Sequence, residues 1–115
     1  MARAICAPFP HRTAWNLPAS RLDTPDVDGA ELDAWYEAFD AEYYAPWILA
    51  GALWICHHGC ALRTVLVVTG PERGNVWYDR RADGEGLEPH VDADGRHLSF
   101  GDWYMAWLRD ALGEH

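Results

Sequence analysis

A stripe of apolar side chains near the C-terminal end is the clearest pattern in the chain. Its members recur at intervals of three and four residues, and they are Phe100, Trp103, Tyr104, Trp107, Leu108, Ala111 and Leu112. This spacing places them on one face of an α-helix. Ser99 followed by Asp102 resembles a helix-capping box, and Gly113 suits the position after a helix end. The pattern therefore predicts a helix over 99–112 whose stripe packs on a sheet.

A second helix is predicted over 31–40, because the same spacing relates Leu32, Trp35, Tyr36 and Phe39. The preceding residues 1–28 are rich in proline, which fixes φ and removes a hydrogen-bond donor. We expect this lead-in to be mostly irregular and to lie across the core through its apolar side chains, Phe9, Trp15 and Leu17.

Three short apolar segments predict strands. Residues 52–56 and 62–69 are nearly continuous apolar runs, and residues 75–79 alternate between two faces. The turn at 70–74 joins the last two into a β-hairpin. Residues 80–96 are charged and glycine-rich, and we expect a loop there with a short strand near Leu87 or Leu98. The expected fold class is α+β, an antiparallel-rich sheet with helices packed on it.

Composition and charge narrow the class of protein. A chain of 115 residues that is 50% hydrophobic and 13% aromatic predicts one globular domain over 1–115. A net charge of -9 disfavours binding to nucleic acid or to an anionic membrane, and suits a basic partner. The longest apolar run, 45–56, is shorter than the roughly 20 residues that span a bilayer. Three cysteines without an export signal favour the cytoplasm.

The segment CHHGC at 56–60 has two interpretations. Cys56, His57, His58 and Cys60 are all possible zinc ligands. Zinc sites usually draw ligand pairs from separated segments, and neighbours on a strand point to opposite faces. Buried thiols that flank a turn at Gly59 are therefore the favoured interpretation, with a zinc site as the alternative.

Catalytic patterns are weak. Asp79 and Asp83 could act as an acid–base pair in an apolar cleft, but Arg80 and Arg81 between them favour a salt-bridged loop. The sequence has no phosphate-binding loop, dinucleotide-binding motif or nucleophile elbow. We therefore expect no catalytic residues, no cofactor and a non-enzymatic protein.

Three segments in order resemble the Smi/Knr-like family of the SUKH superfamily. Residues 51–74 resemble the family's apolar strand, its Gly-Cys turn and its central strand ending in Gly-x-Glu. Residues 99–112 resemble its closing F-x-x-W-Y-x-x-W-L helix. The motif V-W-x-D-x-R with a following Gly and Pro is matched by Val76, Trp77, Asp79, Arg81, Gly86 and Pro89. The best-matching part is 52–112, and residues 8–16 resemble a connecting segment of the same family.

The resemblance implies a non-enzymatic, cytoplasmic protein-binding module. Many bacterial relatives are immunity proteins that neutralise a toxin, often a nuclease, and fungal relatives are regulatory scaffolds. Motif residues would then be structural: Gly74 in the hairpin turn, Asp79 and Arg81 bracing the next loop. The aromatic motif residues would fill the core, and they are Trp77, Trp103, Tyr104 and Trp107.

Contacts to a basic toxin would come from exposed acids of the 80–96 loop, namely Asp83, Glu85, Glu88, Asp92 and Asp94. Family members usually begin with a further helical segment, which this sequence lacks before residues 8–16. A homodimer is one way to cover the sheet surface thereby exposed. A homodimeric scaffold without a toxin partner is the remaining alternative.

Overall fold

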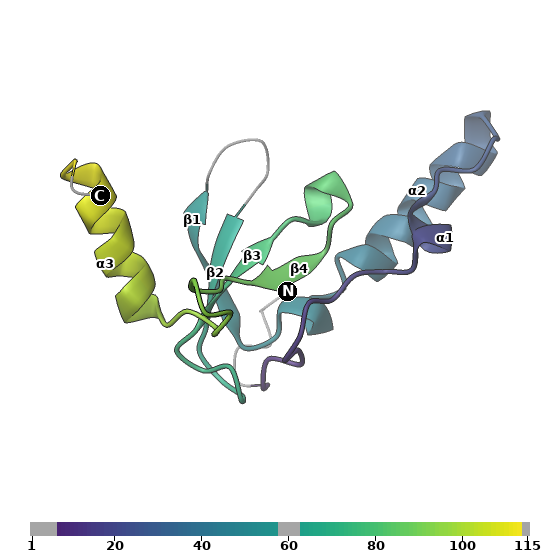
Figure 1. Ribbon diagram of the computed structural model, residues 1–115. Coiled ribbons are helices and arrows are strands. Elements are labelled where there is room, and N and C mark those ends of the chain that lie inside the picture. Colours follow the sequence, from purple (N-terminus) through teal and green to yellow (C-terminus); the bar gives the residue numbers. More distant parts are fainter. Residues whose placement is uncertain (1–6, 58–62, 114–115) are drawn as a thin grey trace.

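The computed structural model describes residues 7–57 and 63–113, and it places a small sheet between two projecting helices (Figure 1). The sheet contains β1 (Ala52–His57), β2 (Arg63–Val67), β3 (Val76–Asp79) and β4 (Leu87–Pro89). The helices are α1 (Ala19–Leu22), α2 (Gly29–Tyr43) and α3 (Phe100–Ala111), with short 3-10 turns η1 (Pro46–Leu49) and η2 (Arg81–Asp83). The radius of gyration is 16.3 Å, against about 13 Å for a compact domain of this length. The projecting helices account for this extended shape.

The four strands form an antiparallel meander in the order β1-β2-β3-β4. The fold class is therefore α+β, as predicted. The central hairpin is in register at Val65 and Trp77, and Gly74 ends its loop at a φ of +89°, where its N–H donates to Val67. The short strand expected near Leu87 is β4.

The core lies on one face of the sheet. Trp77 and Val65 are fully buried there, together with Phe9 from the lead-in and Ile48 from η1. Phe9 contacts Trp77 edge to face at 5.0 Å, and its N–H donates to the carbonyl of Thr69 at 3.0 Å. The predictions that Trp77 is a core residue and that the lead-in lies over the core are both confirmed.

α2 is longer than the predicted 31–40 and is anchored at its C-terminal end. Within α2, all of which is described, Tyr43 is the only buried residue. Its hydroxyl donates to Asn16 Oδ1 at 2.6 Å and accepts from the Gly86 N–H at 3.0 Å. These two distant segments fix the end of the helix, while the rest projects from the sheet (Figure 1).

α3 begins as predicted but does not pack as predicted. The Ser99 hydroxyl accepts from the Asp102 N–H at 3.1 Å, which confirms the cap. Every residue of α3 is described and none is buried, with Tyr104 at 45% and Trp107 at 51% exposed. The expectation that Trp103, Tyr104 and Trp107 fill the core is therefore wrong.

Other segments already cover the core face of the sheet. The lead-in and η1 fill it with Phe9 and Ile48. The start of α3 is held beside the hairpin loop by two backbone interactions. Asn75 forms an isolated antiparallel β-bridge with Ser99, and the N–H of Phe100 donates a hydrogen bond to the carbonyl of Gly74 at 2.7 Å. From that point the helix runs away from the sheet (Figure 1).

Candidate protein-binding surfaces

Negative charge is concentrated on the segment that contains α1 and α2. Residues 19–45, here called the acidic arm, have a net charge of -7 out of -9 for the whole chain. Their one basic residue is Arg21, and their acids are Asp23, Asp26, Asp28, Glu31, Asp33, Glu37, Asp40 and Glu42. The rest of the chain has a net charge of -2.

A row of carboxylates follows one side of α2. Asp33, Glu37 and Asp40 are spaced by four and three residues, so they lie one above the other along the helix. Glu42 pairs with Arg21 of α1, whereas the three members of the row form no ion pair with a described residue. All three are exposed, and the row is available to an external cation.

Aromatic side chains lie next to this row. Trp35 stacks on Phe39 with ring centroids 5.0 Å apart and contacts Tyr36 edge to face at 5.1 Å. Tyr36 is 45% exposed and lies beside the carboxylate row on the helix surface. α2 thus presents rings and carboxylates on adjoining sides.

The second candidate surface is a groove beside α3, here called the α3 groove. It has a volume of about 330 Å³ and is lined by Ile55, Cys56, Phe100, Trp103, Tyr104 and Trp107. Phe100 stacks on Tyr104, and Tyr104 on Trp107, each at 6.0 Å between centroids. The aromatic rings therefore form a continuous ladder, and no lining residue is charged.

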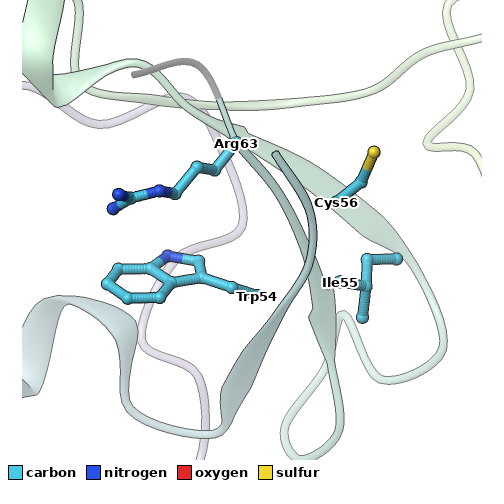
Figure 2. Close-up of a pocket in the computed structure, with 4 residues that line it drawn as sticks. All are labelled: Trp54, Ile55, Cys56 and Arg63. Atoms are coloured by element: carbon cyan, nitrogen blue, oxygen red, sulfur yellow. The ribbon is translucent and has the colours of Figure 1, made fainter. Parts of the chain in front are cut away.

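A β-bulge in β1 supplies the other wall of the α3 groove. The pairing with β2 shifts between Trp54 and Cys56, so Ile55 is the extra residue. Figure 2 shows Arg63 over the ring of Trp54, while Ile55 and Cys56 point to the other side. The Cζ atom of Arg63 lies 4.4 Å from the ring centroid of Trp54. The bulge explains why two successive residues line the same groove.

A buried ion pair holds the loop after β3. Arg81 Nε donates to Asp79 Oδ1 and Nη2 to Oδ2, both at 2.8 Å, while Nη1 donates to the carbonyl of Tyr43 at 3.0 Å. Burial raises the pKa of Asp79, but the hydrogen bonds and charge of Arg81 outweigh burial and hold that pKa below 3.8. The structure therefore shows the predicted salt-bridged arrangement at Asp79, which also ties this loop to the end of α2.

Several of the acids expected to contact a partner form ion pairs or hydrogen bonds within the chain. Glu85 and Glu88 both pair with Arg80, at 3.4 Å and 2.8 Å. Asp92 accepts hydrogen bonds from the N–H groups of Asp94 and Arg96 and so stabilises a turn. Asp94 is exposed, as is Asp83 in η2. The carboxylates of the 80–96 loop are therefore less available to a partner than those of the acidic arm.

Only part of the Cys/His segment can be placed. Cys56 is half-buried in β1, and His57 is the last residue of that strand. His58 and Cys60 lie outside the described residues. Within 7–57 and 63–113, no three His, Cys, Asp or Glu side chains are grouped as metal ligands. The zinc site stays an untested alternative.

Comparison with protein-family models, curated proteins and solved structures finds no match. None of the helices among the described residues is long and apolar enough to cross a membrane. The assignment of function therefore depends on the surfaces themselves. Of these, the acidic arm was missed by the sequence interpretation, although counting charges segment by segment would have found it.

Proposed function

We propose that this protein is a non-enzymatic protein-binding module whose acidic arm docks on a basic partner protein. The observation that carries the proposal is the position of α2, which projects from the sheet with aromatic and carboxylate side chains side by side. Helix residues that serve only stability are normally buried against a core, whereas those of α2 before Tyr43 are not.

The chemistry of α2 suits a protein partner. Aromatic residues are the commonest anchors at the centre of protein interfaces, and Trp35 and Tyr36 are available for that role. The row of Asp33, Glu37 and Asp40 can pair with Arg or Lys side chains across the interface. A charge of -7 on this arm also accelerates capture of a basic protein, by roughly 10 to 1000-fold at low salt.

The resemblance to the SUKH superfamily suggests the class of partner. Immunity proteins of that kind bind toxins in the cytoplasm, and a toxin that grips nucleic acid carries a basic surface. A basic nuclease toxin is therefore the partner that we propose, with its active surface covered by the acidic arm.

The proposal is tested with the product of a toxin-like gene that neighbours the gene for this protein. We expect co-expression to relieve the growth inhibition that the toxin causes, and the purified pair to bind with a Kd that weakens from 50 to 500 mM NaCl. Asp33→Asn, Glu37→Gln and Asp40→Asn combined should weaken binding at least tenfold.

A matched control removes charge from the other acidic surface. Glu85→Gln with Glu88→Gln should change the Kd less than threefold, since both carboxylates are already paired with Arg80. Binding that is lost in this control but kept in the α2 triple variant would assign the interface to the 80–96 loop instead. Binding that does not respond to salt would contradict the electrostatic basis of the proposal.

A further inference from the structure

The α3 groove differs from the acidic arm in being uncharged. Its lining residues are apolar or aromatic, and Asp102 and Arg109 of α3 lie on the opposite side of that helix, while Asp110 lies at the edge of the stripe beside Trp103. A basic protein would find no complementary charge here. The surface fits a partner that presents an apolar face of its own.

We propose that this partner is a second copy of the same chain, and that two α3 helices pair antiparallel about a twofold axis. The stripe residues are Phe100, Trp103, Tyr104, Trp107, Leu108 and Ala111. Their spacing is the same when read in either direction. An antiparallel copy therefore sets each stripe position opposite another stripe position, as an isologous interface requires.

The side chains that meet in this arrangement are complementary in size. Tyr104 lies opposite Trp107 of the second copy at the centre, which places aromatic rings where interface cores favour them. Trp103 lies opposite Leu108 of the second copy. At each end the large Phe100 lies opposite the small Ala111 of the second copy. The register follows from a twofold axis between Met105 and Ala106.

The exposed rings supply much of the apolar area that a dimer interface needs. Phe100, Tyr104 and Trp107 are 38%, 45% and 51% exposed, which leaves roughly 300 Å² of ring surface at 150–250 Å² for each full side chain. Leu112 at 67% exposure extends the same surface. A standard interface buries about 800 Å² on each partner, a little over half of it apolar. The rings supply more than half of that apolar area.

The distribution of charge selects α3 over α2 for self-association. Two chains that met through their acidic arms would bring together two segments of charge -7. Pairing through α3 leaves the acidic arm of each chain on the other side of its own sheet, since α2 and α3 lie on opposite sides of the sheet and diverge (Figure 1). The acidic arms then stay open for the basic partner proposed above, and the two surfaces act independently.

Sedimentation equilibrium of the full chain tests this inference. At tens of micromolar we expect twice the 13.0 kDa mass of one chain, in low salt and at 500 mM NaCl alike. Tyr104→Glu should shift the mass to that of one chain, with an unchanged far-ultraviolet circular dichroism spectrum. Tyr36→Glu is the matched control, because Tyr36 has the same 45% exposure on α2, and it should remain dimeric.

Other outcomes overturn the inference. A wild-type chain that is monomeric at 100 µM, or a Tyr104→Glu variant that stays dimeric, excludes the α3 interface. The antiparallel register has its own test, since Trp103→Glu combined with Leu108→Lys should dimerise more tightly than either single variant. A double variant no tighter than the singles excludes that register. Tyr104→Glu should still bind the basic partner, so the experiment can contradict one proposal without contradicting the other.

Discussion

The guanidinium of Arg81 donates two hydrogen bonds of 2.8 Å to the carboxylate of Asp79, in a site where each residue is 5% exposed. The same guanidinium donates to the carbonyl of Tyr43 and lies 4.7 Å from the ring centre of Tyr44. One side chain therefore connects the loop after β3 with the end of α2. Sequence position alone, two residues after Asp79, gives no sign of this second contact.

Replacing Arg81 should destabilise the protein strongly. Arg81→Met leaves the Asp79 carboxylate buried without its counter-charge, which costs about 3–5 kcal/mol in comparable buried pairs. Urea unfolding followed by circular dichroism measures the loss. Arg80→Met is the control, since Arg80 pairs with Glu85 and Glu88 at the surface and should matter far less. Equal losses in both variants would contradict the prediction that the buried pair contributes more to stability than the surface pairs of Arg80.

Two glycines of similar backbone conformation should respond very differently to alanine. Gly86 has a φ of +73°, and an added Cβ would lie 2.1 Å from the carbonyl oxygen of Trp15. Gly84 has a φ of +74° with open space around its Cβ position. Gly84→Ala should cost about 1–2 kcal/mol, the strain of a left-handed L-residue. Gly86→Ala should cost several kcal/mol more, measured as a fall in Tm, because the backbone of Trp15 must move.

The burial of two tryptophans predicts opposite outcomes for the same substitution. Trp77→Ala removes a fully buried ring and should cost about 3–5 kcal/mol. Trp107→Ala removes a ring that is 51% exposed and should change the stability of the single chain by less than about 1 kcal/mol. Unfolding at submicromolar concentration keeps self-association out of the comparison. A large loss in Trp107→Ala there would mean that α3 packs on the sheet after all.

Stability should fall between pH 7 and pH 5 because of His11. Burial lowers the pKa of His11 below its usual 6.5, and this outweighs the hydrogen bond from Nε2 to the carbonyl of Ile48. The folded state therefore favours the neutral ring. The contribution of His11 to the free energy of unfolding is fully present above pH 6.5 and is lost as the pH falls below that value. The loss is at most about 1.4 kcal/mol per pH unit.

Urea unfolding at pH 7.5 and 5.5 measures this effect, with His11→Gln as the comparison. The variant should lose less stability than wild type over the same interval. Asp79 does not interfere, because its lowered pKa affects stability only below about pH 3.8. An equal loss in both proteins would place the pH dependence in another histidine.

Local patterns predicted the elements better than their packing. The periodicity of 99–112 and the strand at 75–79 give α3 and β3 nearly in full. Trp77 and Trp107 both sit in apolar patterns, yet only Trp77 is buried. Trp77 is buried because Phe9 and Ile48 reach its face of the sheet from distant parts of the chain. No local pattern contains that information.

The candidate surfaces were predictable in part. The net charge suggested a basic partner, and the charged, glycine-rich composition of residues 80–96 suggested that its contacts would be the exposed acids there. The structure pairs Glu85 and Glu88 with Arg80, which a sequence cannot show. The bulge at Ile55 was equally hidden, since a bulge depends on the register between β1 and β2. The α3 groove could therefore be recognised only in three dimensions.

Each long helix is fastened at one end alone, α2 by Tyr43 and α3 by Phe100. The side chains farther out bear little of the fold's stability, so they can be exchanged without loss of the sheet. A lineage that must follow a changing partner could alter Tyr36 or Asp33 freely while keeping Trp77, Asp79 and Arg81. Under the proposed function, the residues that bind a partner and the residues that stabilise the fold are therefore under separate selection.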